Sequence, residues 1–492
     1  MERAAGPHRD EFAEVLRLVV TEAERYLADV DDSPVRRPGA DEIAEAVGGD
    51  LPGTGSGAAA ALTELLDRRA GLIASAGPRF FHFVTGGVTP AALGADWLAS
   101  LVDQNNGDWT GAPLTSQLET VSIRWLLDLF GLPTSWGGVL TTGATMANFV
   151  ALAAARRWWA LRHGADVDQQ GLAGLPPVPV FASGYLHPSD TKVLAMLGLG
   201  RGRPDKLARD AAGRLDLDAL DRELRALGGV PALVIASAGE VNVGDFDPVD
   251  TMADLAEEHG AWLHVDGAFG LFAALSSRTR HLVKGIERAS SVIADGHKWL
   301  NVPYDCGFAF VRDPGLLRPA FGMDAAYLPS LDDPHPNYFS MGPESSRRAR
   351  SLAVWATLRA YGREGYREIV ERHLDLAQRL AARIDAAPDL ERLAGVPLNI
   401  VCFRYRPEGV PEDELDDLNR RLSAAVLEDG RVYFGSTVYE GRVAFRPAIV
   451  NWRTREEDVA LIVEVTRELG ARLTASNRGH DRKEGVGWTD GT

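Results

Sequence analysis

A lysine lies between two short apolar runs of this sequence that have the composition of buried strands. The runs are Ser291–Ala294 and Gly307–Val311, and Lys298 falls in the irregular segment that joins them. A charged amine close to a core is costly unless it is paired, neutralised or covalently bound. Lys298 is therefore either a strand-end lysine that reaches solvent or a lysine whose amine forms a Schiff base with an aldehyde.

A second apolar run ends in a carboxylate 32 residues before this lysine (298 − 266). Residues 261–265 predict a buried strand, and Asp266 follows it directly. A lysine amine and a carboxylate facing the ring nitrogen are the two groups that a pyridoxal 5′-phosphate (PLP) enzyme requires. Asp266 therefore favours the reactive interpretation of Lys298.

Together these segments resemble the group II PLP-dependent decarboxylases, the family of aromatic-L-amino-acid decarboxylase and glutamate decarboxylase. His264–Gly270 (HVDGAFG) and Asp295–Gly307 (DGHKWLNVPYDCG) are similar to that family's HVDAA and PHKW segments. The resemblance spans residues 10–475. It implies the fold type I, aspartate aminotransferase-like architecture, with a mainly parallel α/β large domain, a small α+β C-terminal domain and PLP as cofactor.

The length, net charge and cysteine content of the chain exclude several other classes of protein. A chain of 492 residues predicts two or three domains, and a net charge of −17 disfavours a nucleic-acid or anionic-membrane partner. Cys306 and Cys402 form neither a disulfide framework nor a metal-binding pattern. No signal peptide and no membrane-spanning apolar run is evident, so we expect a cytoplasmic enzyme without bound metal.

Helical and strand-like patterns alternate from about residue 86 to residue 330, which is typical of an α/β domain with a mainly parallel sheet. Ligands collect at the carboxyl ends of such strands. A mixed order of helices and strands follows and predicts a smaller α+β domain. We expect an N-terminal helical segment (1–85), a PLP-binding domain (86–345), a small domain (346–475) and a disordered tail (476–492).

The N-terminal segment carries an apolar stripe at helical spacing between residues 10 and 30. Its members are Phe12, Val15, Leu16, Val19, Val20, Ala23, Tyr26 and Leu27. The stripe packs either on its own chain or on a second subunit, and the residues alone do not decide. The resemblance implies the second alternative, because the family's N-terminal segment wraps the other protomer of a homodimer.

A phosphate-binding turn is predicted where an apolar strand gives way to a helix at residues 139–147. Thr142, Gly143, Ala144 and Thr145 would direct amide groups and a hydroxyl at the cofactor phosphate. Such turns are also common helix caps. The resemblance favours the phosphate role.

Further cofactor contacts are implied by the resemblance. His187 follows the apolar run 178–183 at a predicted helix start, where a histidine is often only a cap. The family stacks an imidazole here on the cofactor ring, where it could also handle protons. By the same resemblance His297 lies near the phosphate, and Ala268 and Asp295 complete the expected cofactor contacts.

Glu240 departs from the family pattern, since the better-known relatives carry a threonine near this point. It follows the strand-like run 232–236. A buried glutamate beside the cofactor would have to be protonated or paired with a cation. The alternative is an ordinary exposed loop acid.

Two aromatic segments, residues 78–87 and 105–119, resemble the family's substrate-cavity lining, part of which comes across the dimer interface. The expected substrate residues are Phe80, Phe81, His82, Phe83 and Trp109. These segments contain no arginine cluster for a second substrate carboxylate. They could also be ordinary core aromatics.

Residues 323–346 form a long stretch of weak periodicity. In the family a loop here offers a tyrosine that protonates the substrate carbon, and counting back from the following helix places Tyr338 in that role. We therefore predict an amino-acid α-decarboxylase that releases CO2 and an amine, with an aromatic or bulky substrate. A different PLP reaction (an aldehyde synthase or a C–C lyase) and a non-catalytic PLP-fold binding protein remain alternatives.

Overall fold

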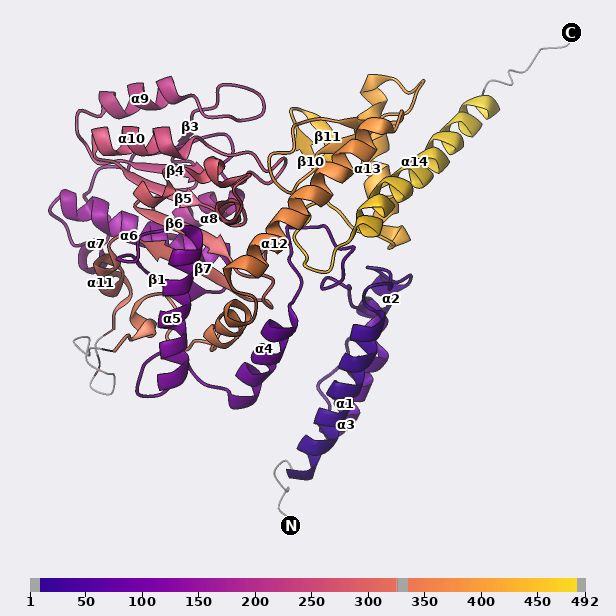
Figure 1. Cartoon of the computed structure of the whole chain (residues 1–492), viewed down its shortest axis with the longest axis horizontal. Coiled ribbons are helices and arrows are strands. Elements are labelled where there is room, and N and C mark those ends of the chain that lie inside the picture. Colours follow the sequence, from indigo (N-terminus) through magenta and orange to yellow (C-terminus); the bar gives the residue numbers. More distant parts are fainter. Residues whose placement is uncertain (1–8, 324, 326–334, 485–492) are drawn as a thin grey trace, which may run out of the picture.

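A computed structural model of the chain describes residues 9–323, 325 and 335–484. Two sheets organise it. The larger lies in the part of the chain up to residue 321, and the smaller lies beyond residue 389. A long helical segment, α12 (Ser351–Ala386), is kinked at Gly362 and runs from the first part to the second (Figure 1).

The larger sheet has seven strands in the order β1-β7-β6-β5-β4-β2-β3. They are β1 (Gly137–Thr141), β2 (Val180–Ala182), β3 (Pro204–Lys206), β4 (Leu233–Ser237), β5 (Trp262–Asp266), β6 (Ser291–Asp295) and β7 (Gly307–Val311). Strands β3, β2, β4, β5 and β6 are parallel to one another, whereas β7 is antiparallel to both β6 and β1. The predicted α/β fold with a mainly parallel sheet is confirmed.

Helices cover this sheet because every residue of β4, β5, β6 and β7 is buried, as apolar strands in a parallel sheet require. Helix α6 packs on β1, β5, β6 and β7, and α10 packs on β4 and β5. The helices of this part are α4 (Pro90–Val102), α5 (Pro113–Phe130), α6 (Ala144–Arg162), α7 (Val167–Gln170), α8 (Pro188–Met196), α9 (Leu217–Ala226), α10 (Val249–His259) and α11 (Leu317–Phe321).

The smaller sheet is antiparallel, in the order β10-β11-β9-β8. Its elements are β8 (Leu390–Arg392), β9 (Phe403–Tyr405), α13 (Glu412–Asp429), β10 (Ser436–Tyr439), β11 (Arg442–Phe445) and α14 (Glu456–Glu484). Helices α13 and α14 pack on each other and on the sheet. This α+β arrangement places the small sheet beside the large one (Figure 1).

Residues 79–89 form a bridge between the two parts. Phe81 N donates to Tyr433 O (2.7 Å) and Ala448 N donates to Phe81 O (3.1 Å), which ties the bridge to the small domain. Gly86 N donates to His297 O (3.1 Å) in the large domain. Residues 432–434, which the sequence predicts as part of a strand, instead pair with this bridge.

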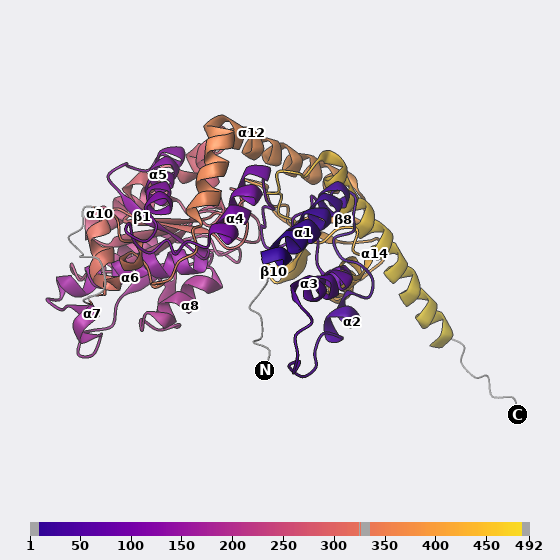
Figure 2. The same ribbon diagram turned by 90° about the horizontal axis from the view of Figure 1, so that it is seen from below.

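The N-terminal helices α1 (Arg9–Asp29), α2 (Ala40–Glu45) and α3 (Ala58–Asp67) lie together to one side of the molecule (Figures 1 and 2). Helix α1 packs on α3. Much of its apolar stripe nevertheless stays exposed, including Phe12 at 67%, Leu16 at 52% and Val20 at 44%. The chain itself therefore leaves most of this stripe uncovered.

Three elements differ from the sequence-based expectation. Helix α12 begins at Ser351, whereas the sequence predicts a helical region that begins at residue 345. The short polar edge strand β3 was not predicted, because its Pro-Asp-Lys sequence has no strand pattern. Helix α14 continues to Glu484, past residue 476, where the expected tail begins. Residues 485–492 of that tail lie outside the described residues.

Within residues 9–323 and 335–484, no helix combines the length and apolarity needed to cross a membrane. The same part of the chain holds no cluster of three or more His, Cys, Asp or Glu side chains suited to a metal ion.

Candidate active site

A cavity of about 520 Å³ lies at the carboxyl edge of the parallel strands, where β4, β5 and β6 end. All the predicted cofactor contacts line it: Thr142, Gly143, Ala144, Thr145, His187, Glu240, Asp266, Ala268, Asp295, His297 and Lys298. These residues come from five separate stretches of the sequence. The fold therefore brings together every group expected at the cofactor.

Lys298 occupies the turn that follows β6, with its amide donating to Asp295 O (3.4 Å). Its Nζ lies 5.7 Å from the centre of the Phe269 ring. Gly86 of the bridge packs closely against this turn from the other side. A Cβ added at Gly86 would lie 1.6 Å from the Lys298 carbonyl oxygen, so only glycine fits there. The backbone on both sides thus holds the lysine at the cavity wall.

Asp266 is the last residue of β5 and is buried. Its Oδ2 accepts a hydrogen bond from Asn148 Nδ2 (3.0 Å), and its Oδ1 accepts one from Ala268 N (3.0 Å). Donors that stabilise a carboxylate favour its charged form. Asp266 is therefore prepared to face a positively charged ring nitrogen.

The amide that binds Asp266 is itself held by a buried chain of hydrogen bonds. His264 contacts Asn148 Oδ1 through Nε2 (3.0 Å) and Ser291 Oγ through Nδ1 (2.8 Å). Trp262 Nε1 donates to the same Ser291 oxygen (3.0 Å). Burial lowers the pKa of His264 to about 4, so the ring is neutral. Each group in this hydrogen-bond series donates to the next, from Trp262 through Ser291, His264 and Asn148 to Asp266. The His264 ring therefore accepts at Nδ1 and carries its proton on Nε2.

His187 caps the N-terminus of α8, and its Nδ1 accepts a hydrogen bond from Ser189 N (3.2 Å). The protein around the ring removes water and lowers the pKa of His187, and the positive charges of Lys298 and Arg446 act in the same direction. The neutral ring then carries its proton on Nε2. This ring is open to the cavity and can lie flat against a cofactor.

The start of α6 forms the opposite end of the cavity. Asp295 Oδ2 accepts from Ala144 N (3.2 Å) and contacts His297 Nε2 (3.1 Å). The first-turn residues Thr145 and Met146 line the same cavity, and amides at a helix start favour anions. A lysine, a carboxylate at the ring position, a neutral imidazole and a helix N-terminus together fit PLP.

Comparison with known proteins decides the family. The pyridoxal-dependent decarboxylase conserved domain matches residues 69–406, well over half of the chain. The chain belongs to this decarboxylase family. PLP is therefore its cofactor, and it is a PLP-dependent carboxy-lyase that acts on an amino acid.

Named relatives agree on the family and differ in substrate. The chain is 30% identical to an aromatic-L-amino-acid decarboxylase of Bacillus atrophaeus, over 81% of this chain and 82% of that protein. It is 32% identical to an L-2,4-diaminobutyrate decarboxylase of Rhizobium meliloti (strain 1021), over 86% and 84%. Oryza sativa TDC with PLP and tryptamine superposes with a TM-score of 0.87 at 25% identity, over 96% of this chain and 100% of that one.

Arg446 of the decarboxylase also lines the cavity, although it was not among the predicted site residues. It follows β11 of the small domain and is only 9% exposed. Its Nη1 has no hydrogen-bond partner, and burial lowers its pKa. A buried guanidinium with a free nitrogen is suited to an anion. The one sequence signal is an arginine directly after a buried apolar run.

Glu240, the departure from the family pattern, is buried at the same cavity. It accepts hydrogen bonds from Asn242 Nδ2 and Val243 N. Burial raises its pKa, against the effect of these donors and of Arg446. The alternative of an exposed loop acid is excluded.

The predicted substrate residues are only partly brought to the cavity. Phe83 and Val84 line it; Phe83 is 65% exposed and Val84 is buried. Both have positive φ angles, 53° and 60°, which residues other than glycine rarely adopt. Phe80 and Phe81 were predicted to line the cavity and do not. Both are buried, and Phe81 packs in the hydrophobic core of the small domain.

His82 and Trp109 also lie outside the cavity lining within one chain. His82 packs between Phe83 and Tyr433, with ring centres 3.7 and 4.7 Å away. Trp109 stacks on His335 at 4.2 Å. The resemblance to the family's lining segments predicted these residues as lining, but within one chain their rings are engaged by neighbours.

Tyr338 is placed away from the cavity as well. It is 4% exposed, its hydroxyl pairs with Thr120 Oγ1 (2.9 Å), and the Arg347 guanidinium lies 5.3 Å from its ring. Burial raises its pKa far above the usual value. We therefore do not assign it the proton transfer to substrate. The other tyrosine of this stretch, Tyr327, lies outside the described residues.

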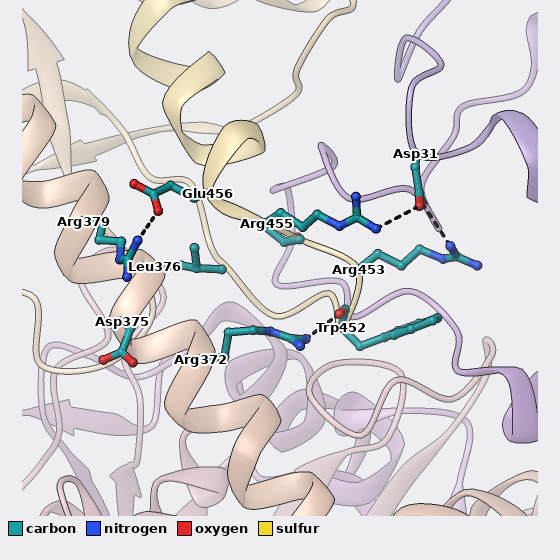
Figure 3. A pocket seen from close by; sticks show the side chains of 10 residues that line it. Asp31, Arg372, Asp375, Leu376, Arg379, Trp452, Arg453, Arg455 and Glu456 are labelled. Carbon is teal, nitrogen blue, oxygen red and sulfur yellow. Dashed lines mark hydrogen bonds and ion pairs between the residues drawn. The ribbon is translucent and has the colours of Figure 1, made fainter.

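A second cavity, of about 490 Å³, lies where the N-terminal segment meets α12 and α14 (Figure 3). Asp31 pairs with Arg453 (3.0 Å) and Arg455 (3.9 Å), and Arg379 pairs with Glu456. These acids pair with three of the lining arginines, Arg372 donates to the carbonyl of Trp452, and none of the cofactor residues is present. This cavity is a junction between segments, not a second catalytic centre.

Proposed function

We propose that this decarboxylase removes the α-carboxylate of an aromatic or bulky L-amino acid and releases CO2 and an amine. The supporting observation is the charge of the cavity wall. Within the described residues, Lys298 and Arg446 are the lysine and arginine that line it. With Lys298 bound to the cofactor and Arg446 to the α-carboxylate, neither is left for an acidic side chain.

The described residues divide the work as follows. Lys298 would hold PLP through its amine, Asp266 would face the ring nitrogen and favour its protonated form, and His187 would contact the ring. Bound PLP supplies a sink for the electron pair that CO2 leaves behind. Arg446 orients the departing carboxylate. Closing water out of this cavity strengthens each of these charge interactions.

The apolar part of the cavity supports an aromatic side chain. Phe83 lines the cavity and is largely exposed in the single chain. Stacking on it would contribute roughly 0.5–1.5 kcal/mol beyond area burial. A glutamate or aspartate side chain would instead lose several kcal/mol of hydration without a charge partner.

A second substrate class rests on Glu240. If this carboxyl group ionises in the complex, it could bind the side-chain ammonium of a diamino acid, and one relative is named an L-2,4-diaminobutyrate decarboxylase. Ionisation of Glu240 is disfavoured, because burial raises the pKa of its carboxyl group. The neutral form favours the aromatic alternative.

Competition between phenylalanine, tryptophan, glutamate and 2,4-diaminobutyrate for CO2 release should favour the aromatic pair by at least about tenfold. Mass analysis of the products would show the amine. Glu240→Gln is the matched variant, because it keeps the size and removes the charge. Turnover confined to glutamate would contradict the proposal, as would an aldehyde product. Turnover of diaminobutyrate that disappears in Glu240→Gln would establish the second class.

We also propose that the chain works as a homodimer in which α1 covers the partner. The supporting observation is the exposed stripe of Phe12, Leu16 and Val20. Contiguous exposed apolar surface commonly marks an interface.

The double variant Leu16→Asp, Val20→Asp should dissociate the dimer, because two buried carboxylates would face the partner without cations. Both positions are exposed in the single chain, so its own fold should be unaffected. Sedimentation of this variant and of a chain lacking residues 1–57 should give monomer or aggregate. Arg17→Ala, on the same helix, is the control. Variants that stay dimeric and active would refute the role of α1.

A further inference from the structure

Asp190 is a buried acid of the cofactor region that neither the family resemblance nor the cavity lining assigns. It lies in the first turn of α8, three residues after His187. Its side chain is 0% exposed, and neither carboxyl oxygen has a hydrogen-bond partner. A fully buried carboxylate without a donor or cation is among the most costly groups in a protein.

The group that faces this carboxyl is a second acid. The Asp190 carboxyl lies within hydrogen-bonding reach of the Asp266 carboxyl, and two acceptor-only carboxylates cannot bond each other. From its own helix, the backbone amides of His187 and Asp190 favour charge on Asp190, but neither makes a hydrogen bond of normal geometry. Burial and the negative charge of Asp266 outweigh them and raise the pKa of Asp190 well above its usual value.

We propose that Asp190 is protonated and donates a hydrogen bond to the Asp266 carboxylate, as a positioning residue for the group that faces the ring nitrogen. Asp266 then has three donors: Asn148 Nδ2, Ala268 N and the Asp190 hydroxyl. The first comes from α6, the second from the turn after β5 and the third from α8. Three donors from different elements would fix the position of the Asp266 carboxylate opposite the ring nitrogen.

This arrangement joins two features of the site in one helical turn. The first turn of α8 presents His187 to the cavity and Asp190 to Asp266. The alternative for an acid at the third helical position is a simple cap that stays ionised. The two interpretations differ in one proton, which can be observed. The inference rests on the proposed role of Asp266 and not on the substrate.

Infrared spectra of the PLP-loaded protein in H2O and D2O test the proton directly. At a pH well above 7, wild type should show the carbonyl band of a protonated carboxyl group, and Asp190→Asn should lose it. Asp247 is the matched control, because it is equally buried but bonds Ser183 and Ser237. Its pKa is raised to about 7, so Asp247→Asn should keep the band. An unchanged band in Asp190→Asn would overturn the proposal.

Asp266→Asn should move the same band to higher frequency, because the hydrogen bond to a charged acceptor is lost. A band that stays in place would show that Asp190 does not bond Asp266 and would overturn the proposal. Normal turnover by Asp266→Asn would instead refute the proposed role of Asp266, whatever the band shows.

Retention of PLP gives the functional measure. Asp190→Leu, which has no donor, should bind PLP about tenfold more weakly, whereas Asp190→Asn should stay near wild type, because its amide can still donate. Equal PLP affinity in all three proteins would overturn the positioning role. Should Asp190→Leu not fold, the near-isosteric Asp190→Asn still decides through its band.

Discussion

Lys298→Ala protein is expected to fold normally and to decarboxylate at least about 10³-fold more slowly than wild type, because it cannot hold the cofactor covalently or exchange it for substrate. The visible absorbance of covalently bound PLP should be absent. Borohydride treatment of wild type should fix the cofactor on Lys298, and mass analysis of peptides would locate it.

Lys284→Ala is the matched control, since this lysine is exposed and pairs with Asp250 (2.6 Å). It should keep wild-type absorbance and turnover. Cofactor fixed on any other lysine, or a Lys298→Ala enzyme with substantial turnover, would contradict the assignment of Lys298.

Replacing Asp266 with alanine should leave a protein that still binds PLP on Lys298 but turns over about 10³-fold more slowly. The ring nitrogen loses its carboxylate, so the electron sink weakens. Single-turnover CO2 release separates this loss from weaker cofactor binding, provided that PLP is saturating.

Asp247→Asn again serves as the comparison. It removes a buried acid near the end of β4 that does not line the cavity, so most of the turnover should remain. Should Asp266→Ala retain near-wild-type turnover, Asp266 would be a structural strand-end acid only.

The sequence predicted the cofactor end of the cavity well for a physical reason. Lys298 and Asp266 each follow an apolar run, and parallel strands deliver their carboxyl ends to one edge. Residues that follow predicted strands in the sequence therefore lie close together in the fold. The same reasoning extends to Thr142–Thr145, which follow β1 and include the start of α6.

Other parts of the site could not be predicted in this way. Arg446 reaches the cavity from the other sheet, so only the packing of the two domains brings it there. Phe80, Phe81 and Phe83 look alike in the sequence, and the positive φ angles at Phe83 and Val84 separate them. Asp190 has the pattern of a helix cap, and its neighbour Asp266 is 76 residues away (266 − 190).

The bridge at residues 79–89 has a consequence for how the enzyme is made. These residues leave the ribosome early, yet Gly86 pairs with His297, 211 residues later (297 − 86), and Phe81 pairs with Ala448, 367 residues later (448 − 81). Contacts so distant in sequence form late and slow folding. The peptide that supports Lys298 is therefore complete only when almost the whole chain has been synthesised. A nascent chain therefore exposes Lys298 before its PLP-binding cavity is complete.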